Sequence, residues 1–368
     1  MNPVVTGMAW DTPLGDSLDG VWTRLCAGES GVAPVPSAHP LRNAEAALVD
    51  DLPYDGTPGE RQRALAARVL LAAFADAGLS PADSGVGLVL GTSFGAALDE
   101  EEESLHAWAD DAVAAIGHPV APVCVATACS AGSDAIAVAH ALVSSGARRI
   151  CVAGGVDVVT EAKRLGHSAL GTMSPTGSRA FDKTRDGMVL GEGAAFLVLE
   201  HPDSARERGV RVRATLAGVG AANDATGLTA PDPTGRSVVL ALRRCLASAG
   251  LGPAEVAVVN AHGTGTALND EVEVTGLREV FGERSPTIFA TKGALGHSLG
   301  ASGAIEAVAT ILALRERVVP PIFGLREPAS SLTFPVGSAA PVTAGAAVST
   351  TLGFGGFDTC LLFTGEAV

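Results

Sequence analysis

The sequence predicts an α/β protein, and two observations carry that prediction. Short runs of β-branched residues alternate with longer Ala-rich stretches along most of the chain. Residues 123–153 also have the pattern of a strand, a helix and a second strand, a unit that implies parallel pairing with a right-handed crossover.

The first half supplies the strands and the helix of this pattern. Residues 86–90 and 123–127 are apolar runs that predict buried strands, residues 149–153 predict the returning strand, and residues 193–200 predict another. The helix between the second and third of these strands has apolar side chains at helical spacing on one face: Ala131, Ala135, Ile136, Val138, Ala139, Leu142 and Val143.

The second half repeats the rhythm. We expect a strand over residues 210–219, a helix over 235–249, and strands over 256–260 and 287–290 that both end in Gly-rich loops. A long helix follows, and residues 347–352 and 357–363 predict a terminal hairpin. Residues 128–142 and 296–312 both run from a turn into an Ala-rich helix. Internal duplication is one explanation, and the Ala and Gly bias of the chain is another.

Composition and charge exclude several classes of protein. The chain is 47% hydrophobic with a formal net charge of −15, which argues against binding to nucleic acid or to an anionic membrane. No apolar run reaches the about 20 residues of a membrane span, and no signal peptide is visible, so we expect a cytoplasmic protein. The six cysteines show neither a CxxC pair nor zinc spacing, so we expect no metal site.

Cys129 is the one cysteine whose surroundings indicate chemistry. It follows an apolar strand and opens the predicted helix, within Thr127-Ala128-Cys129-Ser130-Ala131-Gly132. The unpaired N–H groups and positive dipole end of a helix N-terminus favour a thiolate over a thiol. A buried structural role is the commoner one for an arbitrary cysteine.

Two histidines stand in similar Gly-rich loops. His262 lies just past a strand end, before Thr264 and Thr266, whose hydroxyls can bond a polar ligand. His297 closes the loop Lys292-Gly293-Ala294-Leu295-Gly296-His297, which also follows a strand. The carboxyl edge of a parallel sheet is where ligands bind, although a lone histidine is more often structural.

Two further features complete the set of candidate residues. Lys292 is one of three lysines in a chain that otherwise uses arginine, and Glu306 on the following helix is a candidate ion-pair partner, with a surface pair as the alternative. Phe354 lies in Gly353-Phe354-Gly355-Gly356, where glycines let the backbone approach a ligand and the ring can swing; an ordinary hairpin turn is the alternative.

Together these segments resemble the β-ketoacyl synthase family. The cysteine turn, the HGTGT loop, the KxxxGH loop with its later Glu and the GFGG turn occur in the family's order, and the resemblance covers nearly the whole chain. It implies a thiolase fold, an α/β architecture of duplicated halves in a five-layered α/β/α/β/α arrangement. The halves are expected at residues 1–205, with the nucleophile, and 206–368, with both histidines.

The resemblance also implies the chemistry. Members of the family catalyse decarboxylative Claisen condensation of an acyl-cysteine with a malonyl-type extender in polyketide or fatty-acid biosynthesis. Cys129 would be the nucleophile, His262 and His297 would bond the extender carbonyl, and Lys292 and Glu306 would fix their protonation and position. Thr264 and Thr266 would hold the phosphopantetheine arm and Phe354 would act as a gate.

The implied partners follow from the same resemblance. An acyl carrier protein would deliver the substrates on its phosphopantetheine, with no other cofactor. The chain would form a homodimer, or a heterodimer with a related ketosynthase-like subunit. Two departures from the family stand out: the stretch between Gly95 and Cys124 is short, and Phe357-Asp358 replaces the usual Thr-Asn after GFGG.

Three alternative functions remain. A non-catalytic, chain-length-factor-like partner subunit usually lacks the cysteine, which is present here. A thiolase pairs one histidine with a second cysteine near the C-terminus, where this chain has Cys360. A serine hydrolase would use Ser93 in Gly91-Thr92-Ser93-Phe94-Gly95, although no helix of the expected character opens directly after it.

Overall fold

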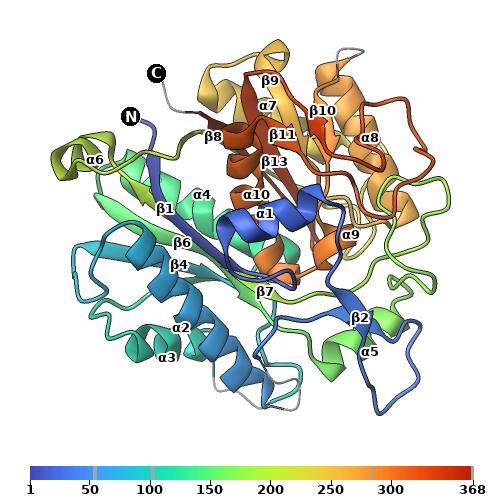
Figure 1. Ribbon diagram of the computed structural model, residues 1–368, viewed down its shortest axis with the longest axis horizontal. Coiled ribbons are helices and arrows are strands. Elements are labelled where there is room, and N and C mark those ends of the chain that lie inside the picture. Colours follow the sequence, from blue (N-terminus) through green and yellow to red (C-terminus); the bar gives the residue numbers. More distant parts are fainter. Residues whose placement is uncertain (53–55, 101–103, 283–284, 366–368) are drawn as a thin grey trace.

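The computed structural model describes residues 1–52, 56–100, 104–282 and 285–365, and it contains two halves of equal topology (Figure 1). Ten strands form one hydrogen-bonded sheet in the order β10-β9-β13-β14-β8-β1-β7-β6-β4-β5, so each half contributes five neighbouring strands. The halves meet where β1 and β8 pair through Val4 with Thr215 and Val5 with Ala214. This strand pairing is short, with two residue pairs between β1 and β8.

The N-terminal five strands are β1 (Val4–Asp11), β4 (Val86–Gly91), β5 (Val123–Val125), β6 (Ile150–Asp157) and β7 (Gly193–Glu200). In this half β1 and β6 run antiparallel to β7, whereas β4 runs parallel to both β5 and β6. The helices are α1 (Leu18–Cys26), α2 (Pro58–Asp76), α3 (Ala107–Ala115), α4 (Ala131–Ser144), α5 (Glu161–Ala169) and α6 (Pro202–Arg208), with the short pair β2 (Val32–Pro34) and β3 (Glu45–Ala47).

The C-terminal five strands are β8 (Ala214–Asn223), β9 (Val256–Asn260), β10 (Thr287–Phe289), β13 (Ala346–Gly353) and β14 (Phe357–Thr364). They repeat the same order and the same directions: β8 and β13 run antiparallel to β14, and β9 runs parallel to β10 and β13. The helices are α7 (Arg236–Ala249), α8 (Ala267–Phe281), α9 (Lys292–Leu295) and α10 (Ser302–Glu316), with the short pair β11 (Val318–Val319) and β12 (Ala340–Pro341).

Five layers result from the way the helices cover these strands. Helices α4 and α10 pack against each other and against strands of both halves, so they form the middle layer. Helix α2, with α3 beside it, covers the outer face of the N-terminal strands, and α7, with α8 beside it, covers the outer face of the C-terminal strands. The expected five-layered thiolase fold with duplicated halves is confirmed, and the repeated topology supports internal duplication.

Helix α10 shows why the middle layer is so apolar. Its residues from Ser302 to Ala313 are all buried, because strands of both halves and α4 surround it. A helix covered on every side needs apolar or small residues all round rather than on one face. Glu306 is the one acidic side chain in that buried stretch, so it needs a partner inside the protein.

Most expected strands exist, with shifted ends. The strand expected over 210–219 begins at Ala214 instead, as β8. The strand expected over 123–127 ends at Val125, because the chain then turns into a short 3-10 helix, η1 (Ala128–Ser130). The expected direct pairing of this strand with the next one is wrong: β5 and β6 both pair with β4, which lies between them.

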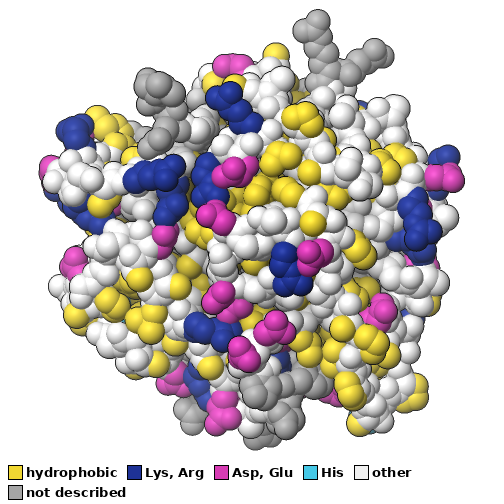
Figure 2. Space-filling model, viewed as in Figure 1, with side chains coloured by type: hydrophobic (Ala, Val, Ile, Leu, Met, Phe, Trp, Pro, Cys, Tyr) yellow, Lys and Arg dark blue, Asp and Glu magenta, His cyan; other side chains and the backbone are white. Residues whose placement is uncertain are grey.

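No helix in the described residues has the length and apolarity needed to cross a bilayer. On the face drawn in Figure 2, acidic and basic side chains lie beside one another rather than in patches of one sign. Arg315, for example, forms ion pairs with both Asp19 and Glu316. The net negative charge is therefore not gathered into a single acidic surface on this face.

Candidate active site

Cys129 occupies a sharp turn between a strand end and the start of a middle-layer helix. We call η1 (Ala128–Ser130) the cysteine turn; it connects the end of β5 to α4. Ala128 has a left-handed backbone with φ of 51°, which is rare for a residue with a side chain and lets the next residue face outward from the turn. Asp134 in the first turn of α4 accepts hydrogen bonds from Thr127 and Ser130, so it holds the turn closed.

The thiol is buried, and this overturns one expectation from the sequence. Burial raises the pKa of Cys129 to about 11, although the Lys292 ammonium and an N–H of Phe354 that donates to the sulfur both oppose the rise. The helix start was expected to favour the thiolate. In the free protein the loss of solvent outweighs the effect of Lys292 and the Phe354 N–H, so the resting group is a thiol.

His262 is held by its backbone from an outer helix. It follows β9, and the N–H groups of His262 and Gly263 donate to the two carboxylate oxygens of Glu273 at 2.8 and 2.7 Å. Gly263 has φ of 47°, and a Cβ there would lie 2.7 Å from the Cβ of Ala290, so the loop needs glycine at this position. Sequence reasoning missed Glu273, which lies within α8, 11 residues beyond His262.

His297 is held by a segment of the other half. Its N–H donates to the carbonyl of Val189 at 2.8 Å, and its carbonyl accepts from the N–H of Gly191 at 2.9 Å. A Cβ on Gly191 would lie 2.3 Å from the carbonyl oxygen of Leu295, so only glycine lets the two segments meet. The N–H of Leu299 donates to Nδ1 of His297 at 3.2 Å, and Ser302 Oγ lies 2.9 Å from the same nitrogen.

Lys292 and Glu306 form a fully buried ion pair rather than a surface pair. Their side chains are 2% and 1% exposed. The Lys292 Nζ also donates to the carbonyl of His262 at 2.6 Å and lies 3.1 Å from its Nδ1. Burial raises the pKa of Glu306 to about 7 while Lys292 opposes the rise. The pair therefore places a cation directly behind the His262 ring.

The contacts at Nδ1 decide which nitrogen of each histidine carries the proton. An ammonium and a backbone N–H can only donate, so Nδ1 of both His262 and His297 accepts, and the ring proton resides on Nε2. Burial and the nearby Lys292 hold the pKa of both rings well below the usual range, so both are neutral. The rings meet edge to face with centroids 5.2 Å apart.

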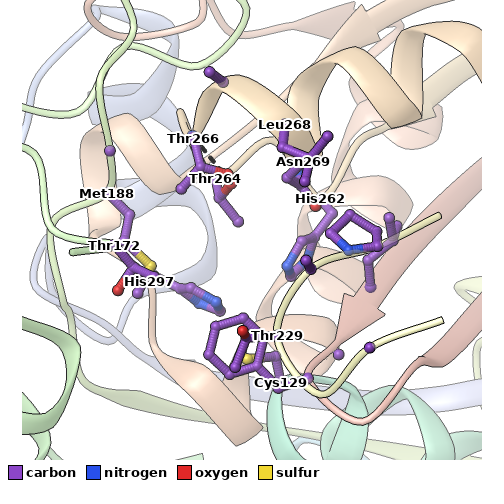
Figure 3. A pocket seen from close by; sticks show the side chains of 18 of the residues that line it. Cys129, Thr172, Met188, Thr229, His262, Thr264, Thr266, Leu268, Asn269 and His297 are labelled. Carbon is purple, nitrogen blue, oxygen red and sulfur yellow. Dashed lines mark hydrogen bonds between the residues drawn. The ribbon is translucent and has the colours of Figure 1, made fainter. Parts of the chain in front are cut away.

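One cavity of about 360 Å³ collects these groups. Figure 3 shows Cys129, His262 and His297 facing it, with Thr264 and Thr266 on its far wall. Phe354 lines the same cavity, and the hydroxyls of Thr264 and Thr266 lie 2.9 Å apart. All the residues that the family resemblance singled out thus meet at this cavity, except Lys292 and Glu306, which are absent from its lining; Lys292 contacts His262 from behind, and Glu306 pairs with Lys292.

His167 is a lining residue that the sequence did not single out. It belongs to α5, and its ring lies 6.0 Å from that of Phe354 between centroids. Burial lowers the pKa of His167 to about 4, so the ring is neutral. Its isolated position in Gly166-His167-Ser168 gave no motif to recognise, because only the folded chain places it beside Phe354.

The residues of the alternative functions lie elsewhere. Cys360 on β14 is fully buried, and its thiol contacts Cys245 of α7 on the outer side of the sheet. Ser93 is buried, and its hydroxyl has no hydrogen-bond partner among the described residues, so no histidine activates it there. Across residues 1–52, 56–100, 104–282 and 285–365, no group of three or more His, Cys, Asp or Glu is arranged to hold a metal ion.

The replacement of the usual Thr-Asn after GFGG has a local consequence. Phe357 is 40% exposed, whereas the Asp358 carboxyl is buried and bonds Ser237 near the start of α7. Burial and the neighbouring Asp224 and Asp134 raise the pKa of Asp358 to about 7. The side chain therefore faces the outer layer, on the opposite side of β14 from Thr359, which donates to Asp134 of α4.

Comparisons with known proteins agree with this architecture. The family profile "Beta-ketoacyl synthase, N-terminal domain" matches residues 1–205, and "Beta-ketoacyl synthase, C-terminal domain" matches residues 213–326. A 3-oxoacyl-[acyl-carrier-protein] synthase 2 from Synechocystis sp. is 30% identical, over 98% of this chain and 97% of its own length.

Two solved structures share the fold. "The ishigamide ketosynthase/chain length factor" is 29% identical with a TM-score of 0.90, over 100% of this chain and 99% of its own. The second structure is that of a type II PKS acyl-carrier protein in complex with its ketosynthase bound to the hexaketide. The matched chain is 24% identical with a TM-score of 0.90, over 99% of both chains.

Proposed function

The chain belongs to the β-ketoacyl synthase family and is an acyltransferase that condenses acyl units, and we propose how its own residues divide that reaction. One observation carries the proposal: a cysteine and two neutral histidines, each with its proton on Nε2, line a single cavity. The same observation disfavours a non-catalytic partner subunit, since the nucleophile and both donors are present together.

In the first step Cys129 takes the acyl group from a carrier-protein thioester. The Sγ–carbon bond forms, the bond from the acyl carbon to the pantetheine sulfur breaks, and the thiol proton ends on that departing sulfur. The N–H groups of Cys129 and Phe354 would stabilise the tetrahedral oxyanion, since the Phe354 N–H already points at the sulfur. Because the resting thiol is neutral, its deprotonation belongs to this step rather than to the free enzyme.

In the second step a malonyl-type extender loses CO2. The electron pair of the broken C–C bond passes to the extender thioester, and its enolate oxygen accepts from Nε2–H of both His262 and His297. Such a preorganised donor contributes about 3 kcal/mol to transition-state stabilisation. The enolate carbon then bonds the acyl carbonyl carbon, and collapse of that tetrahedral intermediate breaks the bond to the Cys129 sulfur, which leaves as a thiolate and takes a proton from solvent.

The remaining residues support these two steps. Lys292 keeps Nδ1 of His262 an acceptor, and Glu306 balances its charge inside the protein. Thr264 and Thr266, on the cavity wall, would bond the polar groups of the pantetheine arm. Phe354, flanked by glycines, would open and close the path to Cys129. No cofactor beyond the carried substrates is expected, and the cytoplasmic location stays a prediction.

The partners are also proposed. A ketosynthase in a solved complex binds an acyl-carrier protein, and we infer that a carrier delivers the substrates here as well. Strand β5 lies at the sheet edge with Val123 48% exposed, and Phe94, Leu98 and Val138 are exposed too. Such an edge favours a dimer, with a second copy or with a related subunit. Sedimentation of the purified chain, alone and with neighbouring gene products, measures which forms.

The assignment of Cys129 is tested by two substitutions. Cys129→Ala should abolish the acyl adduct that intact-mass spectrometry detects after incubation with an acylated carrier, whereas Cys26→Ala should leave it. Cys129→Gln should still release CO2 from a malonyl carrier, because both histidine donors survive. An undiminished adduct in Cys129→Ala, or no CO2 release by Cys129→Gln, would refute this division of roles.

A further inference from the structure

The chain carries a second turn with the same backbone as the cysteine turn. A 3-10 helix, η3 (Leu299–Ala301), leads into the middle-layer helix α10 as η1 leads into α4. Leu299 has φ of 45°, close to the 51° of Ala128, and both are left-handed residues with side chains. Gly300 then stands where the first turn has Cys129. We call this second one the glycine turn.

The backbone N–H of the glycine turn is already occupied by a carboxylate. Oδ2 of Asp157, the last residue of β6, accepts from the N–H of Gly300 and from the N–H of Ser93, both at 2.9 Å. The other oxygen, Oδ1, is paired with the Lys163 ammonium, and both side chains are buried. Asp157 thus links a strand end of the N-terminal half to the turn that begins α10.

The space beside the glycine turn is filled by the same groups. A Cβ on Gly300 would lie 2.3 Å from the nitrogen of Ser93 and 2.8 Å from Oδ2 of Asp157. Since no side chain fits there, the turn can serve only as a backbone support. The carbonyl of Gly300 is also closely packed, because a Cβ on Gly155 would lie 2.5 Å from the Gly300 carbonyl oxygen.

The supported group is His297, two residues before the turn. The N–H of Leu299, which fixes the acceptor role of His297 Nδ1, belongs to the peptide just before the one whose N–H donates to Asp157. We propose that Asp157 is a positioning residue for His297: by accepting from Gly300 and Ser93, its carboxylate fixes the glycine turn and so aims Nε2–H of His297 at the extender carbonyl. This inference rests on the proposed function, in which His297 assists decarboxylation.

The charge and the hydrogen bonds of Asp157 can be separated. Asp157→Asn/Lys163→Met keeps an oxygen acceptor for the two N–H groups and removes both charges. Asp157→Ala/Lys163→Met removes the same charges and the acceptor. A matched control is Glu200→Ala/Arg208→Met, which deletes another buried carboxylate with its cation; Glu200 lies at the opposite end of β7 from the residue that pairs with Asp157.

The assay uses the full-length chain in the Cys129→Gln background, with CO2 release from malonyl carrier protein as the readout. We expect the Asp157→Ala double variant to release CO2 at least tenfold more slowly, the Asp157→Asn double variant within threefold of its parent, and the control within twofold. With Cys129 intact, the rate at which iodoacetamide alkylates Cys129 should change less than threefold in all of them.

A second readout follows the histidine itself. In protein labelled with 15N-histidine, the side-chain signals of His297 should shift in the Asp157→Ala double variant while those of His262 stay in place. Equal CO2 release by the Ala and Asn double variants, or a parallel fall of CO2 release and alkylation in step with the folded fraction, overturns the positioning role. No CO2 release by the Cys129→Gln parent would instead sink the proposed function.

Discussion

The cysteine turn and the glycine turn share one backbone conformation and differ in what the neighbouring strand end places beside them. Beside the cysteine turn, β13 ends in Gly353, and the next residue directs its N–H at the sulfur. Beside the glycine turn, the equivalent strand β6 ends in Asp157, whose carboxylate takes the Gly300 N–H. The first arrangement leaves a cavity in front of the turn and the second fills it.

This difference teaches how a duplicated fold acquires one active site. Both turns begin a buried helix, and both have a backbone N–H at the same place. In the N-terminal half the turn presents a reactive side chain to the cavity. In the C-terminal half the turn became a rigid backbone support next to His297, because a carboxylate and two N–H groups satisfy one another there. The two turns therefore differ at two pairs of positions: Cys129 corresponds to Gly300, and Gly353 corresponds to Asp157.

The largest expected effect comes from adding one methyl group to the glycine turn. Gly300→Ala forces a Cβ against the Ser93 nitrogen, a backbone atom that cannot step aside cheaply, and should lower the free energy of unfolding by about 3 kcal/mol. The matched change in the other turn, Cys129→Ala, only shortens a side chain that borders the cavity and should cost about 1 kcal/mol or less. Urea denaturation of both variants gives the two values.

Equal losses for the two variants would contradict this comparison, since they would mean that the glycine turn yields to a side chain. Gly300→Ala should also slow CO2 release, because the turn that moves adjoins His297. If the variant loses stability but keeps CO2 release in its folded fraction, the packing of the glycine turn affects stability without affecting the orientation of His297.

The second effect concerns what the helix start does to the thiol. Burial raises the pKa of Cys129 to about 11. Between pH 7 and 9 the thiolate fraction then grows tenfold with each pH unit, and the rate of alkylation by iodoacetamide should follow it. The rate is measured from the mass of the peptide that contains Cys129. A rate that levels off below pH 8 would show instead that the dipole at the helix start outweighs burial.

The sequence predicted the groups that react and missed those that support them. Cys129, His262 and His297 each lie in a recognisable motif after a predicted strand, and the resemblance of these motifs to the β-ketoacyl synthase family indicated that they act together. Sheet topology alone was not enough, because β5 and β10 lie at opposite ends of the strand order. Glu273 and Asp157 act through contacts with backbone N–H groups that lie 11 and 143 residues away. No local pattern marks such a contact, because the fold alone brings those residues together.

The same distinction explains the errors. The direction of the Cys129 pKa was wrong because a helix start is visible in the sequence and burial is not. The pairing of residues 123–127 with 149–153 was wrong because β4, which precedes both in the chain, inserts between them. Strand order within a sheet is set by packing, whereas the alternation of strand and helix is set locally, and only the second can be read from periodicity.

The smallest expected effect tests the backbone that the two turns share. A left-handed residue with a side chain is strained by about 1–2 kcal/mol, and glycine relieves that strain while losing some entropy on folding. Ala128→Gly should therefore raise the free energy of unfolding by up to about 1 kcal/mol.

At the second turn Leu299→Gly must be compared with Leu299→Ala, because the buried leucine side chain contributes to stability on its own. The step from alanine to glycine should have the same sign and size at both positions in urea denaturation. Glycine destabilises a regular helix relative to alanine. If glycine also destabilises either of these turns relative to alanine, the two turns do not share the same backbone strain.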